Sequence, residues 1–177
     1  LYGMLLASGN DAANAAAAAV GGTVDNFVKM MNEKAKSLGL KNTHFVTPSG
    51  LDADGHYSTA YDMAILAKNA LSNADFAKAA ATKEKTVALN NGEKKITLTN
   101  HNRLLRSYSD VTGVKTGFTK KSGRCLVSSA EKDGRKVIAV TLNDPDDWKD
   151  HRYMLDLGLE TVKEYTAGPK QLYAKVK

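Results

Sequence analysis

The segment that decides the fold is GVKTGFTKKSGRCLVSSAEKDGRKVIAVTL, which runs from Gly113 to Leu142. Apolar and β-branched residues gather in three runs between turn residues, and these runs predict strands over 113–118, 124–130 and 136–142. The pair Asp133-Gly134 is a strong signal for a two-residue hairpin turn. Alternation along the middle run places Leu126, Ser128 and Ala130 on one face. The segment therefore predicts an antiparallel meander.

Upstream, the pattern predicts one further hairpin and, before it, mostly helix. Strands are expected over 85–89 and 94–98, with Asn90-Asn91-Gly92 as their turn. Capping residues and helical periodicity predict helices over about 12–20, 23–38, 59–71 and 75–81. The first of these is nearly all alanine, so we expect it to be packed on every side at the centre of the molecule. The stretch 40–58 is expected to be an ordered loop, anchored by His44 and His56.

Helices that precede an antiparallel run of strands are typical of an α+β domain, in which helices cover the sheet. We expect 1–177 to form part of a single domain. Its helical part is predicted over about 10–82, its sheet part over about 85–142 and a terminal helix over about 147–165.

The composition is that of an ordinary globular protein, with 42% hydrophobic and 25% charged residues. The formal charge is +6, but lysines and arginines are spread along the chain. This distribution favours a solvated basic surface, and we expect no nucleic-acid partner. Cys125 has no second cysteine to pair with and is expected to be a small buried residue. The histidines lack metal-ligand spacing, so we expect no metal site.

Two short motifs carry the chemistry, Ser8-Gly9-Asn10 and Lys115-Thr116-Gly117. Each alone is weak, because the first is a common turn and the second a common strand end. Together they match two of the three motifs of the active-site serine penicillin-recognising enzymes, which are Ser-x-x-Lys, Ser-Asp-Asn and Lys-Thr-Gly. In the carboxypeptidase branch of these enzymes the second motif is commonly Ser-Gly-Asn, as in this chain.

The likeness continues between and beyond the motifs, in Leu38–Phe45, Pro48–Leu51, His56–Ala64, Asn100–Leu105 and Gly123–Leu142. The chain therefore resembles the penicillin-binding D-alanyl-D-alanine carboxypeptidases over nearly its whole length. The resemblance implies a β-lactamase/transpeptidase-like fold, incomplete at the N-terminus, with no cofactor.

The resemblance also assigns roles to individual residues. Ser8 is implied as a proton relay beside the leaving group, and Asn10 as the side chain that holds the substrate amide. Lys115 is implied to supply the positive charge that tunes the serine hydroxyls and attracts the substrate's terminal carboxylate.

Four further residues are implied to bind substrate. Thr116 would donate a hydrogen bond to the substrate carboxylate, and Gly117 would leave room for substrate along the strand edge. The backbone N–H of Phe118 is the implied second oxyanion donor. Arg152 is expected to help hold the carboxylate.

The third motif, Ser-x-x-Lys, carries the nucleophile and lies upstream of Ser-Gly-Asn in the family. We expect no serine of the chain, from Ser8 to Ser129, to be followed three positions on by lysine, so we expect the nucleophile motif to be absent from this chain. Three explanations are open: the upstream part is a separate chain, it has been deleted, or the chain is a natural relative that has lost catalysis. Without the upstream part a sheet edge is expected to be exposed, which favours that missing segment or a homo-oligomer as a partner.

The implied function is part of a serine-type carboxypeptidase that removes the terminal D-Ala from peptidoglycan stem pentapeptides. Stem peptides and β-lactams are its implied partners, and its implied location is outside the cytoplasmic membrane. Two alternatives stay open. One is a class A-like β-lactamase, although such enzymes favour Ser-Asp-Asn and use a deacylating glutamate. The other is a non-catalytic module that binds cell-wall peptides.

Overall fold

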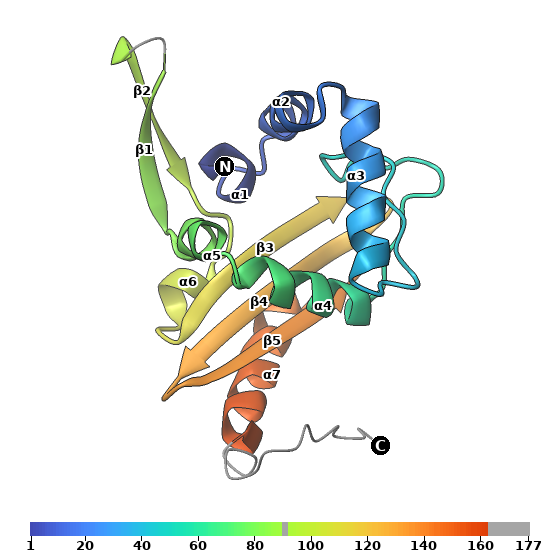
Figure 1. Cartoon of the computed structure of the whole chain (residues 1–177). Coiled ribbons are helices and arrows are strands. Elements are labelled where there is room, and N and C mark those ends of the chain that lie inside the picture. The colour runs from blue at the N-terminus through green and yellow to red at the C-terminus, as the bar shows by residue number, and fades with distance from the viewer. Residues whose placement is uncertain (90–91, 163–177) are drawn as a thin grey trace.

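The computed structural model describes residues 1–89 and 92–162 and contains two antiparallel sheets (Figure 1). A hairpin pairs β1 (Glu84–Leu89) with β2 (Lys94–Thr99), and a meander has the order β3 (Val111–Thr119), β4 (Gly123–Lys132) and β5 (Arg135–Leu142). The five predicted strands are thus confirmed. The turn between β4 and β5 is also confirmed, because Asp133 and Gly134 both have positive φ, at 49° and 77°. The predicted turn residues Asn90 and Asn91 lie outside the described residues.

Helices cover both faces of the larger sheet, which confirms the predicted α+β architecture (Figure 1). One face packs against α7 (Asp147–Thr161), and the other against α4 (Ala60–Leu71) and α5 (Ala74–Ala81). Alternate residues of β4 enter the two cores. Leu126 packs in the cluster that contains Leu155 of α7, whereas Val127 packs in the cluster that contains Ala67 of α4. The sheet is therefore held from both sides.

The helices begin where their capping residues lie. Thr23, Thr59 and Asn73 each accept a hydrogen bond from the backbone N–H three residues on, at the starts of α3 (Val24–Ser37), α4 and α5. Each such cap stabilises its helix by about 1 kcal/mol. Two single-turn helices, α1 (Tyr2–Leu5) and α6 (Leu104–Ser107), complete the set. Among the residues that the structure describes, no helix combines the length and apolar character that crossing a bilayer requires.

The alanine-rich helix α2 (Asn10–Gly21) corrects one expectation. It was predicted to be central and packed on every side, but most of its residues are at least partly exposed and Val20 is 64% exposed. Its main contacts are with α3 and α1. Alanine has the highest helix propensity at exposed as well as buried positions, so its abundance did not report burial. The helix starts after Gly9, without the predicted side-chain cap from Asn10 or Asp11.

The segment between α3 and α4 is an ordered loop, as predicted. An isolated bridge joins His44 to Tyr57, and His56 Nδ1 accepts hydrogen bonds from the backbone N–H groups of Val46 (3.0 Å) and Thr47 (3.3 Å). The buried carboxylate of Asp62 closes the base of the loop, because it accepts from the Asn42 N–H and the Thr43 hydroxyl. The anchoring roles predicted for the two histidines are confirmed.

The terminal helix α7 buries a histidine completely. The predicted end of this helix at about residue 165 lies outside the described residues. His151 is 0% exposed, and its Nε2 lies 3.1 Å from Thr141 Oγ1. Burial lowers the pKa of His151 to about 4, although Asp147 and Asp144 act in the opposite direction. The unfolded chain takes up this proton near the ordinary value of 6.5, so it binds more protons between pH 6.5 and 4. Stability is therefore lost as the pH falls through that window.

Replacing His151 with glutamine should reduce this acid sensitivity. The loss of unfolding free energy between pH 7 and pH 4 should be smaller in His151→Gln than in the parent, by up to about 3 kcal/mol. Urea unfolding at the two pH values measures the difference. The exposed His101, changed to glutamine, is the control and should behave as the parent does. Equal pH dependence in His151→Gln and the parent would contradict the assignment.

Candidate active site

The structure brings Ser8 and Lys115 into direct contact, although 107 residues separate them in the sequence. Lys115 Nζ donates a hydrogen bond to Ser8 Oγ and a second to the Thr116 carbonyl, at 2.7 Å. Ser8 lies just before α2 and has a φ of 51°, a left-handed conformation that is unfavourable for a residue with a Cβ. The bond from Gly9 N–H to the Gly3 carbonyl (3.0 Å) helps to hold this turn. Two of the predicted site residues therefore meet.

Lys115 is an unusual lysine because its side chain is partly withdrawn from water. It pairs with Val127 across the ladder, and its neighbour Val114 is only 3% exposed. Within residues 1–89 and 92–162 no carboxylate forms an ion pair with it. Burial lowers the pKa of Lys115 to about 8. Near neutral pH the amine can thus act as a cation, and at slightly higher pH it can accept a proton.

The rest of the Lys-Thr-Gly strand lies on an open edge. In the described sheet β3 is an outer strand, and Phe118 is 70% exposed. A Cβ added at Gly117 would meet Cys125 Cβ at an ordinary 3.7 Å, so internal packing does not require glycine there. The predicted reason, free space on the outer side of the strand, is consistent with this geometry. Thr116 is half-buried, and Asn10 is exposed as the first residue of α2.

The 40–58 loop reaches the end of the same strand. Thr119 Oγ1 donates to Asp52 at 2.8 Å, and the exposed pair Lys121–Asp54 lies at 3.9 Å. This contact could not be predicted from the sequence, because no motif joins the two segments. Cys125, opposite Gly117, is half-buried rather than buried as predicted, and its Sγ lies 3.7 Å from the Ser122 carbonyl.

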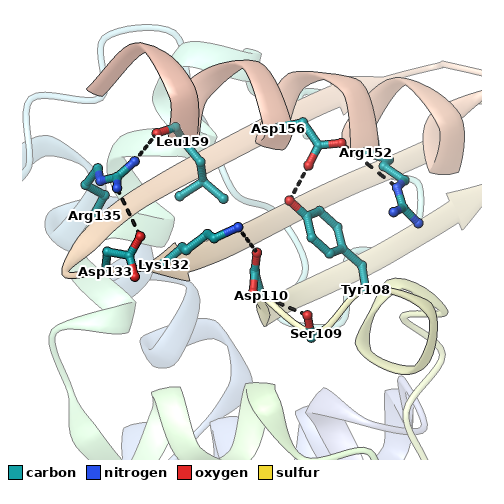
Figure 2. A network of polar contacts seen from close by, with 9 residues as sticks. All are labelled: Tyr108, Ser109, Asp110, Lys132, Asp133, Arg135, Arg152, Asp156 and Leu159. Atoms are coloured by element: carbon teal, nitrogen blue, oxygen red, sulfur yellow. Dashed lines mark hydrogen bonds and ion pairs between the residues drawn. The ribbon is translucent and has the colours of Figure 1, made fainter. Parts of the chain in front are cut away.

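Arg152 is the one predicted site residue that the structure places elsewhere. Its guanidinium lies 4.9 Å from the Tyr108 ring, and its Nε lies 4.0 Å from Asp156, which accepts a hydrogen bond from the Tyr108 hydroxyl (Figure 2). Burial, with help from Asp156, raises the pKa of Tyr108 to about 12. These contacts occupy Arg152 around α7 and do not join it to Lys115. A role for Arg152 at the substrate carboxylate stays a prediction.

The letters Ser-x-x-Lys do occur once, in Ser129-Ala130-Glu131-Lys132, which corrects the expectation that the pattern is absent. The four residues lie on β4, where positions three apart point to opposite faces. Ser129 is 3% exposed and shares a hydrogen bond with Thr112, whereas Lys132 pairs with Asp110 at 3.8 Å (Figure 2). The two side chains do not form a nucleophile and base.

Two buried amides near the site were not singled out from the sequence. Asn100 and Asn102 are 3% and 1% exposed, and both belong to the resemblance quoted above without an assigned role. Asn102 Nδ2 donates to the Gly113 carbonyl at 3.1 Å, close to Lys115 along β3. A pair of asparagines two residues apart before a short helix was the available signal.

Comparison with known proteins places this arrangement in context. The family described as D-alanyl-D-alanine carboxypeptidase matches residues 1–146. The D-alanyl-D-alanine carboxypeptidase DacF of Bacillus subtilis is 49% identical over 140 residues, which is 79% of this chain and 36% of the relative. The chain thus spans little more than a third of the length of DacF.

Solved structures give the same result for the fold. The DD-transpeptidase of Streptomyces K15 matches with 35% identity and a TM-score of 0.86, over 90% of this chain and 66% of that one. Penicillin-binding protein D2 from Listeria monocytogenes, solved in its cefotaxime-bound form, matches with 33% identity and a TM-score of 0.78, over 89% and 64% of the two chains. The β-lactamase/transpeptidase-like fold predicted from the motifs is therefore confirmed.

The burial of Lys115 has a cost in stability that can be measured. The unfolded chain holds this proton up to the ordinary pKa of 10.5, whereas the folded chain releases it near 8. The unfolded state therefore binds more protons between these values, and the contribution of Lys115 to stability rises across that window. Below pH 8 the buried ammonium opposes folding.

Changing Lys115 to methionine should therefore raise the free energy of unfolding at pH 7, by about 2 kcal/mol. The gain should shrink between pH 8 and pH 10.5, as the parent loses its buried charge. Urea unfolding at pH 7 and pH 10 measures this. Lys68→Met, at an exposed position of α4, is the matched control and should show no such change. A gain from Lys115→Met that is the same at both pH values would be the contrary result.

Proposed function

Because the chain belongs to the D-alanyl-D-alanine carboxypeptidase family, we propose that it supplies two walls of the acyl-transfer site of a serine-type D-Ala-D-Ala carboxypeptidase. The contact between Ser8 and Lys115 carries the proposal, because it joins the Ser-Gly-Asn and Lys-Thr-Gly motifs at one place. In this proposal the nucleophilic serine and its lysine come from residues outside these 177.

The proposed chemistry is attack on the carbonyl of the penultimate D-Ala, release of the terminal D-Ala, and hydrolysis of the acyl-enzyme. Ser8 passes a proton from Lys115 to the leaving nitrogen. The ammonium of Lys115 also attracts the substrate's carboxylate, and the hydroxyl of Thr116 donates a hydrogen bond to it. Asn10 holds the substrate amide.

The edge of β3 is the proposed seat of the substrate backbone. An extended peptide can add to the unpaired N–H and C=O groups of an edge strand. Gly117 keeps side-chain atoms out of its path, and the Phe118 N–H donates to the developing oxyanion. The open edge of β3 and the exposure of Phe118 support this placement.

The proposed substrate is the peptidoglycan stem pentapeptide, with β-lactams as inhibitors, and the proposed location is outside the cytoplasmic membrane. The names of the relatives and the cefotaxime held by the Listeria protein support this proposal. A net charge of +6 suits an anionic cell wall. The class A-like β-lactamase alternative is not favoured, because the relatives are named as carboxypeptidases and transpeptidases.

The chain by itself should form no penicilloyl adduct. Ser129, the only serine with a lysine three positions on, is buried on β4 and faces away from that lysine. Incubation with a fluorescent penicillin, followed by intact mass measurement, checks this expectation. Full-length DacF treated in parallel is the positive control. A covalent adduct on the isolated chain would contradict the prediction.

The proposed function is tested by joining the chain to an upstream segment that carries Ser-x-x-Lys. The joined protein should release D-Ala from diacetyl-L-Lys-D-Ala-D-Ala. Ser8→Ala and Lys115→Met should each lower kcat/KM by about 100-fold or more, since each removes a group that acts in proton transfer. Ser72→Ala, at the exposed C-terminal end of α4, should match the parent. Peptide binding without turnover would favour the non-catalytic module instead.

A further inference from the structure

The contact between Ser8 and Lys115 joins two segments whose relative position needs a separate explanation. Ser8 precedes α2, whose main contacts are with α3 and α1. Lys115 lies on β3, which is held by β4 and by α5. The packing of α1 on α5, which itself packs on β3, gives one link between the Ser8 side of the molecule and Lys115, and a hydrogen-bonded link stands beside it.

One short segment between β2 and α6 is bonded to both. The backbone N–H of His101 donates to the carbonyl of Leu6 at 3.2 Å, two residues before Ser8. The next residue, Asn102, donates from Nδ2 to the carbonyl of Gly113 at 3.1 Å, two residues before Lys115. Leu6 is 0% exposed and Asn102 is 1% exposed, so both bonds are made away from water.

The segment is itself held rigidly. Asn100 Nδ2 donates to the carbonyls of Ala80 (3.2 Å) and Thr82 (3.0 Å), and its Oδ1 accepts from the Asn102 N–H (2.9 Å). Asn102 Oδ1 accepts from the Leu104 N–H at 3.1 Å. Both amides thus use donor and acceptor together, which a carboxylate, a hydrocarbon or a single ammonium cannot reproduce.

We propose that Asn100–Asn102 is a positioning element that sets where Ser8 and Lys115 stand relative to each other, with Asn102 as the positioning residue for Lys115. The element reaches the Ser8 turn through a backbone N–H and β3 through a side-chain amide. Its effect on catalysis rests on the proposed function, because misplacement of reacting groups by about 1 Å can cost about 100-fold in rate. Its effect on the pair itself needs no turnover to be observed.

The first test compares two asparagines that make the same kind of bond. Asn32, on α3, is the matched control. Its side-chain amide donates to the Phe45 carbonyl and accepts from the Phe45 N–H, both at 2.8 Å. In Asn102→Ala the loosened strand should admit water to Lys115, and the pKa of Lys115 should rise by one unit or more from about 8. Asn32→Ala should leave that pKa unchanged.

The readout is the pH dependence of acylation of each lysine by a soluble amine reagent, resolved by peptide mass spectrometry. At pH 8 the rise in pKa lowers the labelling of Lys115 in Asn102→Ala by about five-fold relative to the parent. Thermal unfolding of both variants shows whether they are destabilised alike. If Asn102→Ala is folded and Lys115 titrates as in the parent, the positioning role is overturned and the amide only supports the fold.

A second pair of variants decides the matter if Asn102→Ala does not fold. His101→Pro removes the N–H that reaches Leu6, whereas His101→Ala keeps that N–H and removes only the exposed imidazole. His101→Pro should shift the titration of Lys115 in the same direction, and His101→Ala should not. Identical titrations in these two variants would overturn the proposal. The two proposals can fail separately. If the pKa of Lys115 shifts as expected in His101→Pro, but the joined parent protein releases no D-Ala, the proposed function is refuted and the positioning role stands.

Discussion

The partial burial of Lys115 is the constraint on which the site depends. Hydrogen bonds from a charged donor contribute about 1.5–3 kcal/mol each, and Lys115 makes two, to Ser8 and to the Thr116 carbonyl. Taking an ammonium out of water without a carboxylate partner costs several kcal/mol. The two quantities are of similar size, and burial is the cause that lowers the pKa of Lys115 to about 8. The same cost makes the proton easy to release, which a proton relay requires.

A partly buried cation stays in place only if the surrounding structure is rigid, and the packed sheet provides that rigidity. β4 lies between β3 and β5, and its alternate residues enter the cores on the two sides of the sheet. Movement of β3 away from β4 would therefore disturb both cores. The outer edge of β3 has no such restraint among the described strands. β3 thus presents the Lys115 side chain from one face of the sheet and unpaired backbone groups at its outer edge.

Local chemistry was predictable from the sequence, and contacts between distant segments were not. The caps at Thr23 and Thr59 and the Asp133-Gly134 turn depend on residues within a few positions of each other, so their patterns sufficed. The exposure of α2 was mispredicted, because alanine suits a covered and an uncovered helix equally. The family motifs indicated that Ser8 and Lys115 belong to one site. The motifs did not indicate which residues hold them together, although the closely spaced Asn100 and Asn102 were a local signal.

The stretch Ser129–Lys132 shows why that distinction matters in this fold. A serine and a lysine three positions apart share a face on a helix, but on β4 they point to opposite sides of the sheet. Whether the two side chains can exchange a proton is decided by the secondary structure, since side chains repeat about every 3.6 residues on a helix and every 2 on a strand, and not by the Ser-x-x-Lys pattern itself. Ser8 and Lys115 obtain the same pairing by a tertiary contact, which no local geometry guarantees. Its accuracy must come from bonds that span the two segments, and buried amides, which donate and accept at once, are well suited to make them.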